Sequence, residues 1–403
     1  MKGKKMNGFP TREQALTDFF AEWEFEPKVE LVSLADSCDR IVARDLVSAN
    51  TLPVVRSSCC DGIAVRAADF AQGMPDTSAW RLGSEYVRAD TGDDFPDEFD
   101  SVIMIEEVTM RDDGSIEIEP DVQVTLGCNV NAAGSSIREG DPVMAAGMPI
   151  RPTDLAAMAV GGIAMVPVFE RPKVAFIPTG SELVPAGVKP RRGQNVDTNS
   201  LMVPAMLRQM GADPIVFPIV YDIRGALNRA IEEAIESADM VVINGGTALG
   251  SEDFNFQILR ERGKLVHHYI AAAPGRPLAM AVIDGKPVVN LPGPSMGAWY
   301  GAGWCLSACV ARMLHQPVVM PQKVMARTDE GIRHGGPMAF LQRMEVHRDE
   351  NGDLVAEERS FRDTSISICL GTNAQRVLQI GADAVEPGGT IDVELLRPIE
   401  YIL

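Results

Sequence analysis

The stretch ERPKVAFIPTGSELVPAG, residues 170–187, decides the fold of the central part of the chain. Its run VAFIP is continuously apolar and ends in Thr179 and Gly180, which is typical of a strand buried on both faces of a parallel sheet. The segments PIVFPIV (214–220) and DMVVIN (239–244) read as further strands. Between them lie two helical patterns, the first capped by Asn199 or Ser200 and ending at Gly211, the second capped by Asp222. This alternation predicts βαβ crossovers and a three-layer α/β domain over residues 170–316.

The flanking segments have different patterns. Residues 10–24 read as a helix that starts with a capping box of Thr11 and Gln14. From 43 to 136 short apolar runs alternate with turn residues, which predicts an inserted, mostly β domain. Helical composition returns near 155–165. The tail, 317–403, predicts a small C-terminal β domain of the barrel kind that closes with TIDVELL.

Composition limits the function. The 403 residues include 46% hydrophobic and 23% charged residues, as in soluble multidomain proteins. A net charge of −19, from 37 basic and 56 acidic residues, argues against nucleic acid or anionic lipid as a partner. We find no signal peptide and no membrane-length apolar run. The seven cysteines form no C-x-x-C pair and predict reduced, cytoplasmic thiols, with the adjacent Cys59 and Cys60 as packing residues rather than a redox pair.

The segment INGGTALGSEDF (243–254) combines glycines with acids. Gly245, Gly246 and Gly250 allow backbone N–H groups to approach an oxyanion closely. Glu252 and Asp253 suit a divalent cation that bridges to phosphate, since Mg²⁺ is commonly held by one or two carboxylates and phosphate oxygens. The alternative is that one of these acids caps the following helix.

Two more loops have a similar composition. PTGSELVPAG supplies Thr179, Gly180 and Glu182, and LPGPSMGA (291–298) follows the strand PVVN. Three such loops at the carboxyl edge of one sheet predict a pocket for a phosphorylated ligand. The five histidines lie outside these loops, and the nucleophile-elbow, Walker A and H-E-x-x-H motifs are missing from the sequence. The residues alone therefore indicate metal-assisted phosphate chemistry.

The order of motifs resembles the molybdopterin molybdenumtransferase family, the group of MoeA and the gephyrin E domain. LPVVRSSCCDGIAVR (52–66) is similar to the family's approach to its D-G-Y-A-V-R motif, and IREGDPV (137–143) to its G-E-D loop. Four further stretches resemble family loops in the same order. PTGSELVPAG resembles the T-G-D-E-L loop, and INGGTALGSEDF the G-G-V-S-V-G-x-x-D loop. AAPGRP (272–277) resembles the K-P-G-K-P loop, and LPGPSMGA the L-P-G-N-P loop. The likeness covers nearly the whole chain.

The resemblance implies four parts and a reaction. The parts would be a split, elongated N-terminal domain (1–42 and 137–169), the inserted β domain (43–136), the α/β molybdopterin-binding domain (170–316) and the C-terminal β domain (317–403). The reaction is insertion of molybdate, or tungstate, into adenylated molybdopterin, with Mg²⁺-dependent cleavage of the adenylate and release of AMP. A homodimer with the cleft between subunits is implied, and the molybdopterin adenylyltransferase is a candidate protein partner.

The resemblance also implies site residues, which are assigned by their positions in the matching motifs. Asp61, Asp141, Glu182 and Asp253 are the candidate catalytic residues, with Glu182 and Asp253 holding the metal and Asp61 and Asp141 reaching the cleft from the other subunit. For Asp222, substrate binding and the helix cap are both open. The candidate substrate-binding residues are Thr91, Thr179, Gly180, Ser181, Asp222, Gly245, Gly246, Thr247, Gly250, Gly275, Arg276, Pro292, Gly293 and Ser295.

Departures from the family motifs leave two functions open. Cys60 and Ile63 replace Met and Tyr of M-D-G-Y, Ser181 replaces Asp of T-G-D-E-L, and Pro294 and Ser295 stand where the family has Asn-Pro. In AAPGRP the two lysines of K-P-G-K-P become Ala273 and Arg276, which halves the charge available to an anion. The chain is then either an active insertase or a non-catalytic carrier, store or sensor of molybdopterin or the cofactor. A nucleotide pyrophosphatase or deamidase is disfavoured because the likeness extends beyond the α/β domain.

Overall fold

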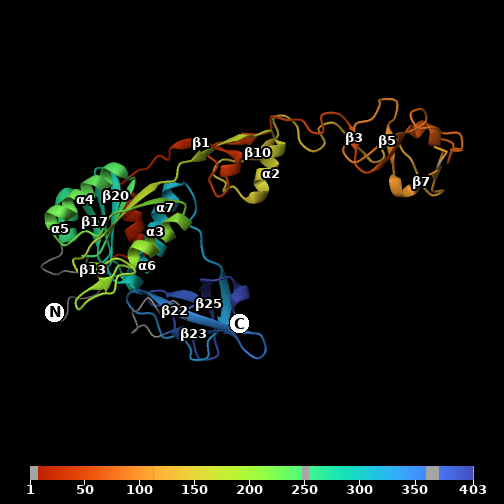
Figure 1. Ribbon diagram of the computed structural model, residues 1–403. Coiled ribbons are helices and arrows are strands. Elements are labelled where there is room, and N and C mark those ends of the chain that lie inside the picture. Colours follow the sequence, from red (N-terminus) through yellow and green to blue (C-terminus); the bar gives the residue numbers. More distant parts are fainter. Residues whose placement is uncertain (1–7, 112, 247–253, 360–371, 403) are drawn as a thin grey trace. The chain divides into compact units, whose positions relative to one another are not determined.

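The computed structural model describes residues 8–111, 113–246, 254–359 and 372–402 (Figure 1). The chain forms two compact units. The first unit joins the N-terminal segment up to Lys28 to residues 170–403, and the second comprises Val29–Phe169. Within the described residues, none of the helices combines the length and apolar character needed to cross a bilayer.

A six-stranded sheet forms the centre of the first unit. Its strand order is β15 (Asp213–Val216), β12 (Lys173–Pro178), β16 (Met240–Asn244), β20 (Lys286–Leu291), β19 (Ala279–Ile283) and β17 (Lys264–His268). The strand predicted from VAFIP is β12, which pairs in parallel with β15 on one side and β16 on the other. Its side chains from Val174 to Pro178 are all buried, as a strand covered on both faces requires.

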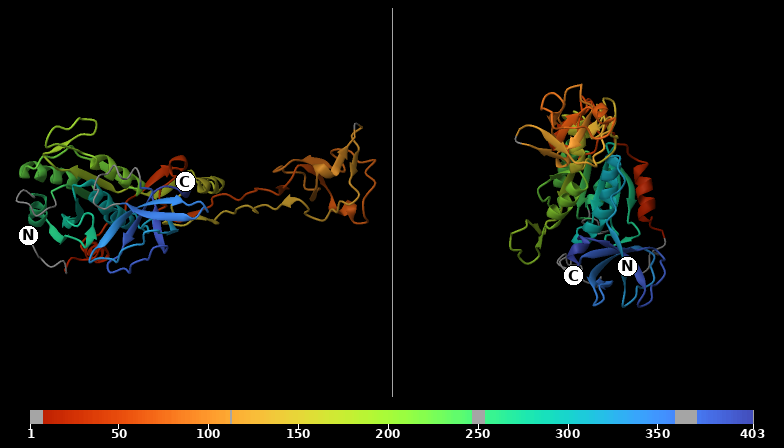
Figure 2. Two further views of the ribbon diagram at one scale, coloured as in Figure 1. Left: turned by 90° about the horizontal axis from the view of Figure 1, so that it is seen from below. Right: turned by 90° about the vertical axis from the view of Figure 1, so that its right-hand side faces the viewer.

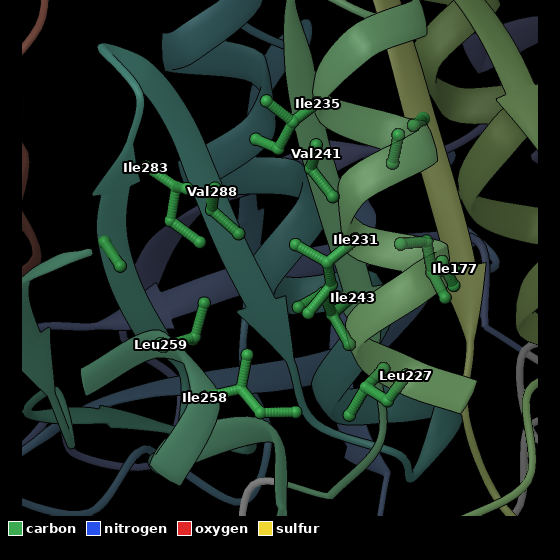
Figure 3. Close-up of a cluster of buried hydrophobic side chains, with 14 of the residues drawn as sticks. Ile177, Leu227, Ile231, Ile235, Val241, Ile243, Ile258, Leu259, Ile283 and Val288 are labelled. Carbon is green, nitrogen blue, oxygen red and sulfur yellow. The ribbon is translucent and has the colours of Figure 1, made fainter. Parts of the chain in front are cut away.

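Helices cover both faces of this sheet, so the predicted three-layer α/β domain is confirmed (Figure 1). One face carries α4 (Arg224–Ser237) and α5 (Phe254–Arg262). The other carries α3 (Asn199–Gln209), α6 (Ser295–Gly301), the π-helical η4 (Ala302–Leu306) and α7 (Ser307–Met313). The core under α4 and α5 contains Leu227, Ile231, Ile243 and Ile258, each at most 2% exposed (Figure 3).

One strand of the sheet runs against the parallel pattern. β19 is antiparallel to both β20 and β17, so β17 again has the direction of β12, β16 and β20. The link from β19 to β20 consists of Asp284 and Gly285, which have φ of 51° and 76°. A two-residue turn of this kind joins antiparallel neighbours and is too short for a crossover. The first unit therefore has a mixed sheet rather than a purely parallel one.

The C-terminal part of the first unit is a closed β-barrel. Its strands are β21 (Lys323–Arg327), β22 (Ala339–Arg348), β23 (Leu354–Arg359), β24 (Ala374–Leu378) and β25 (Thr390–Leu395). They pair in the ring β22–β23–β21–β25–β24, and β24 returns to β22. Met344, Val393 and Ala374 fill the interior and are fully buried. The expected C-terminal barrel is thus confirmed, and β18 (Ala272–Ala273) adds a short parallel strand beside β22.

The N-terminal helix α1 (Arg12–Phe20) contacts β17 and η4 of the same unit. Thr11 caps it, with its hydroxyl accepting from the backbone N–H of Gln14 at 3.2 Å. The other half of the predicted capping box is wrong, because the Gln14 amide donates to Asp18 instead (2.7 Å). The helix ends at Phe20 rather than at residue 24, although Trp23 beyond it is still buried.

The second unit is built mainly from short strands (Figure 2). Two strand pairs join distant segments of this unit: β1 (Val29–Ser33) pairs with β11 (Met165–Phe169), and β2 (Leu46–Val47), at the start of the predicted insertion, pairs with β10 (Pro142–Met144). These pairs and α2 (Pro152–Val160) share the core around Val42 and Met158, which is the expected split domain. The insertion contains β3 (Ser57–Ser58), β4 (Gly62–Val65), β5 (Val87–Ala89), β6 (Ser101–Met104), β7 (Val108–Met110), β8 (Ile116–Ile118) and β9 (Val130–Asn131). Its β character is confirmed, while the boundaries at 42/43 and 136/137 stay predictions.

Candidate functional site

Three loops leave the carboxyl ends of adjacent parallel strands at one edge of the central sheet. The β12 loop is residues 179–182, the β16 loop begins at Gly245, and the β20 loop is residues 292–295. Since β12 pairs with β16 and β16 with β20, the loops are neighbours, as the sequence predicted. Edges of this kind are where open α/β sheets bind ligands.

Buried asparagines connect these loops. Asn244, the last residue of β16, donates to the Pro292 carbonyl (2.8 Å) and accepts from the Asn199 amide (2.9 Å). The Asn199 amide also donates to the Gly293 carbonyl (2.8 Å). Beside this contact, the hydroxyls of Thr198 and Ser295 lie 2.7 Å apart. The start of α3 and the β20 loop are therefore held together by side-chain hydrogen bonds.

A second set of bonds fastens the β12 loop to the β16 loop. Asn255 donates to the Gly245 carbonyl (2.8 Å) and to the Thr179 hydroxyl (3.2 Å). The Thr179 hydroxyl donates in turn to the Asn244 carbonyl (3.1 Å). Thr179, Asn244 and Asn255 are each at most 4% exposed, and buried amides and hydroxyls of this kind are costly unless bonded. The network fixes the spacing of the loops.

Glycines in the β16 loop allow this close approach. Gly245 and Gly246 have φ of 119° and 50°. A Cβ at Gly245 would lie 2.5 Å from the Thr179 carbonyl oxygen, and one at Gly246 would lie 2.7 Å from the Asn255 amide nitrogen. The positive φ and the lack of space for a Cβ atom therefore both require glycine at these two positions.

A fourth loop, the β19 entry loop (residues 273–277), reaches the same edge because β19 is reversed. Gly275 has φ of 98°, and a Cβ there would lie 3.0 Å from the Gly297 carbonyl oxygen and 3.4 Å from the Pro292 side chain. The loop therefore packs against the β20 loop. Arg276 is exposed, whereas Ala273 belongs to β18 and pairs with Phe340.

The β12 loop is braced from outside by Asp222. The Ser181 N–H donates to the Asp222 carboxylate (2.9 Å), and the Asp222 N–H donates to the Ser181 hydroxyl (3.0 Å). The predicted helix-cap role of Asp222 is wrong, since Ile223 occupies the N-cap of α4 and no side chain caps that helix. The cap predicted from Asn199 or Ser200 is also wrong, because Thr198 is the N-cap and Asn199 faces the loops.

Glu182 is the exposed carboxylate of the β12 loop. Among the described residues, no hydrogen bond or ion pair engages its side chain. The second predicted metal ligand, Asp253, lies outside the described residues, as do Thr247, Gly250 and Glu252. Gly180, next to Glu182, has φ of 150° and donates its N–H to the Val220 carbonyl (3.1 Å). No cluster of three or more potential ligands occurs within the described ranges.

In the second unit, Asp61 and Thr91 are brought together. The Thr91 N–H and hydroxyl both donate to the same Asp61 carboxylate oxygen at 2.7 Å. These two bonds lower the pKa of Asp61, with the backbone bond contributing most. The pairing brings the segments around Asp61 and Thr91 together.

The other predicted positions of the second unit have local surroundings. Asp141 accepts from the Arg138 N–H (2.8 Å) and so closes a turn. Cys60 packs against the cluster of Phe95, Phe99 and Val102, and burial raises its pKa to about 11. A thiol of that kind stays protonated at neutral pH, which fits the packing interpretation for Cys60. Cys59 is exposed, so the packing interpretation is wrong for that residue.

Sequence reasoning missed the asparagines as loop connectors. The available signal was a polar residue at the carboxyl end of an apolar run, as in DMVVIN and PVVN. Asn290 of PVVN is fully buried, and with its amide nitrogen facing inward it donates to the carbonyls of Gly245 (3.0 Å) and Ile243 (3.1 Å).

Comparisons with known proteins identify the class of protein to which the chain belongs. Residues 11–162 match the MoeA N-terminal region (domain I and II), and residues 175–310 match a probable molybdopterin binding domain. The molybdopterin molybdenumtransferase of Haemophilus influenzae is 27% identical over 98% of this chain and 99% of its own length. That of Bacillus subtilis is 26% identical over 92% and 90%. The crystal structure of the molybdopterin biosynthesis MoeA protein from Pyrococcus horikosii matches with a TM-score of 0.79 at 25% identity, over 97% of this chain and 100% of that one.

The fold and these matches define a multidomain protein of molybdenum cofactor biosynthesis with a molybdopterin-binding α/β domain. More narrowly, the chain belongs to the MoeA family and is a molybdopterin molybdenumtransferase-like enzyme.

Proposed function

We propose that the chain inserts molybdate or tungstate into adenylated molybdopterin, with cleavage of the adenylate and release of AMP. The observation that carries this proposal is the set of three loops at one sheet edge, held at fixed spacing by buried asparagines. An extended ligand with a pyrophosphate needs such a series of backbone and polar contacts. The names of the full-length relatives, molybdopterin molybdenumtransferases, support the same reaction.

We propose that Glu182 is one ligand of a Mg²⁺ ion and that Asp253 is the second. The exposed Glu182 carboxylate, without an ion pair among the described residues, fits a cation that is completed by phosphate oxygens. When bound, Mg²⁺ would stabilise negative charge on the leaving phosphate. Arg276, exposed on the β19 entry loop, would bind ligand oxygens through its bidentate guanidinium.

The remaining predicted residues complete the proposal. Asp61, held by Thr91, and Asp141 are proposed to act on the substrate from a second subunit of a homodimer. The substrate-binding set predicted from sequence is kept, with Asp222 acting by holding Ser181. We also propose a cytoplasmic location, the four domain boundaries given above, and the molybdopterin adenylyltransferase as a partner that delivers the substrate.

The test is AMP release from adenylated molybdopterin on addition of molybdate, at limiting Mg²⁺. Wild type should release AMP, and Glu182→Ala should need more Mg²⁺ to do so. Glu236→Ala, which removes another exposed carboxylate in the last turn of α4, is the matched control and should behave as wild type. Tight binding of the pterin without AMP release would favour the carrier function that the loss of the lysine at Ala273 suggests.

Subunit association is tested separately by sedimentation. We expect a symmetric homodimer at micromolar concentration. A monomer would remove Asp61 and Asp141 from the proposed site, because each is assigned there through the partner subunit.

A further inference from the structure

Tyr269 has an unusual backbone for a bulky residue. Its φ is +72°, in the left-handed region that residues other than glycine and asparagine rarely adopt. It directly follows β17, whose carboxyl end lies at the same sheet edge as the loops described above. A strained residue of this kind persists only where its surroundings hold it.

The ring of Tyr269 lies against the side chain of Arg276. The guanidinium carbon of Arg276 is 5.7 Å from the ring centroid, within the range of a cation–π contact. Two backbone bonds join the same segments: the Ile270 N–H donates to the Arg276 carbonyl (2.9 Å), and the Tyr269 N–H donates to the Leu278 carbonyl (3.2 Å). The ring and the β19 entry loop are therefore fixed relative to each other.

The N-terminal segment supports the ring. Phe9 stacks on Tyr269 with centroids 5.6 Å apart and planes inclined by 26°. The Pro10 carbonyl accepts from the Ala271 N–H (2.9 Å), which fastens this segment beside the β19 entry loop. Removal of Phe9 should loosen Tyr269 without opening a core, since the Phe9 side chain is 38% exposed.

Arg276 is available to an anion. In a chain with 56 acidic and 37 basic residues, it makes no ion pair with any carboxylate among the described residues. Its loop packs on the β20 loop through Gly275. An arginine side chain loses much rotamer freedom when it binds a phosphate, so a ring that already confines it reduces that loss.

We propose that Tyr269 is a positioning residue that holds the Arg276 guanidinium ready for the phosphate groups of the ligand. The identity of that ligand rests on the proposed function, but the positioning role does not require turnover. Nothing in the spacing of AAPGRP predicted this partner, because Tyr269 lies before that stretch, directly after the end of β17.

The experiment is calorimetric titration of the full chain with inorganic pyrophosphate. Arg276→Ala should weaken binding about ten- to a hundredfold, as for loss of a charge-assisted contact. Tyr269→Asn keeps a residue that tolerates positive φ but removes the ring, and should weaken binding about two- to thirtyfold. Tyr269→Phe keeps the ring and should bind as wild type. In a protein that already carries Arg276→Ala, Tyr269→Asn should not weaken pyrophosphate binding further.

Three results would overturn the proposal: unchanged pyrophosphate binding in Arg276→Ala, equal losses in Tyr269→Phe and Tyr269→Asn, or an undiminished effect of Tyr269→Asn without Arg276. Should Tyr269→Asn fail to fold, Phe9→Leu takes its place and should weaken binding only where Arg276 is present. AMP release is measured in parallel. If the binding pattern appears without AMP release, the proposed insertion reaction fails while the positioning role stands.

Discussion

Replacement of Asn244 by alanine should separate the loops of the candidate site. The Asn244 side chain is 3% exposed and makes two hydrogen bonds, to the Pro292 carbonyl and from the Asn199 amide. Its removal leaves both partners buried and short of one bond. An unsatisfied buried polar group costs about 1–3 kcal/mol, so the free energy of unfolding of the first unit should fall by about 2–6 kcal/mol.

The measurement is urea unfolding followed by tryptophan fluorescence, because Trp299 and Trp304 lie in α6 and η4 of the same unit. Asn195→Ala is the matched control, since its side chain is exposed on β14 (Asn195–Val196), and it should change stability by less than about 0.5 kcal/mol. Pyrophosphate binding should weaken in Asn244→Ala and not in the control. The reasoning is refuted if both variants unfold at the same urea concentration.

Three further outcomes are expected. Glu182→Ala should raise the Mg²⁺ requirement of AMP release while leaving the unfolding curve unchanged; an unaltered metal requirement would count against the assignment. Thr91→Val removes one of two bonds to Asp61, so the pKa of Asp61 should rise toward its ordinary value, as read from its carboxyl resonance in a pH titration. Because the folded-state pKa is lowered, this bond stabilises the fold above the unfolded pKa of about 3.9, and the contribution is lost as pH falls through the folded-state value; an unmoved resonance would refute it. Ala273→Lys restores a second cation and should improve the use of molybdate about ten- to a hundredfold in an AMP-release titration, unless wild type already saturates at low molybdate.

The local periodicity of the sequence was sufficient to predict much of the fold. The buried strand β12, the helix α4 and the closing strand β25 each have a pattern that sets both element type and burial. The reversal of β19 was not predicted, although Asp284-Gly285 is a hairpin signal in its own right. The barrel type of the C-terminal domain depends on pairing between β22 and β24, which are distant in sequence.

The candidate site was predicted in part for a similar reason. Glycines and acids after apolar runs mark the loops, because backbone conformation and strand ends are local properties. Which side chains then bond across the loops depends on three-dimensional neighbours. The cap of its own helix was therefore one of the two roles predicted for Asp222, whereas its carboxylate accepts from Ser181, 41 residues earlier. Asn199 was assigned to a cap for the same reason, yet it bonds Asn244 and Gly293.

The reversed strand β19 also has a practical consequence. It enters the sheet at the edge of the candidate site and leaves at the opposite edge, where Asp284 and Gly285 make their turn. A Cβ at Gly285 would meet no atom within 4 Å, and Asp284 is exposed. Short exposed turns tolerate inserted residues better than the elements they connect. A fluorophore or peptide tag placed at this turn would be joined rigidly to β20 and separated from the β20 loop by the length of that strand, so the protein could be labelled or immobilised with its ligand edge left open.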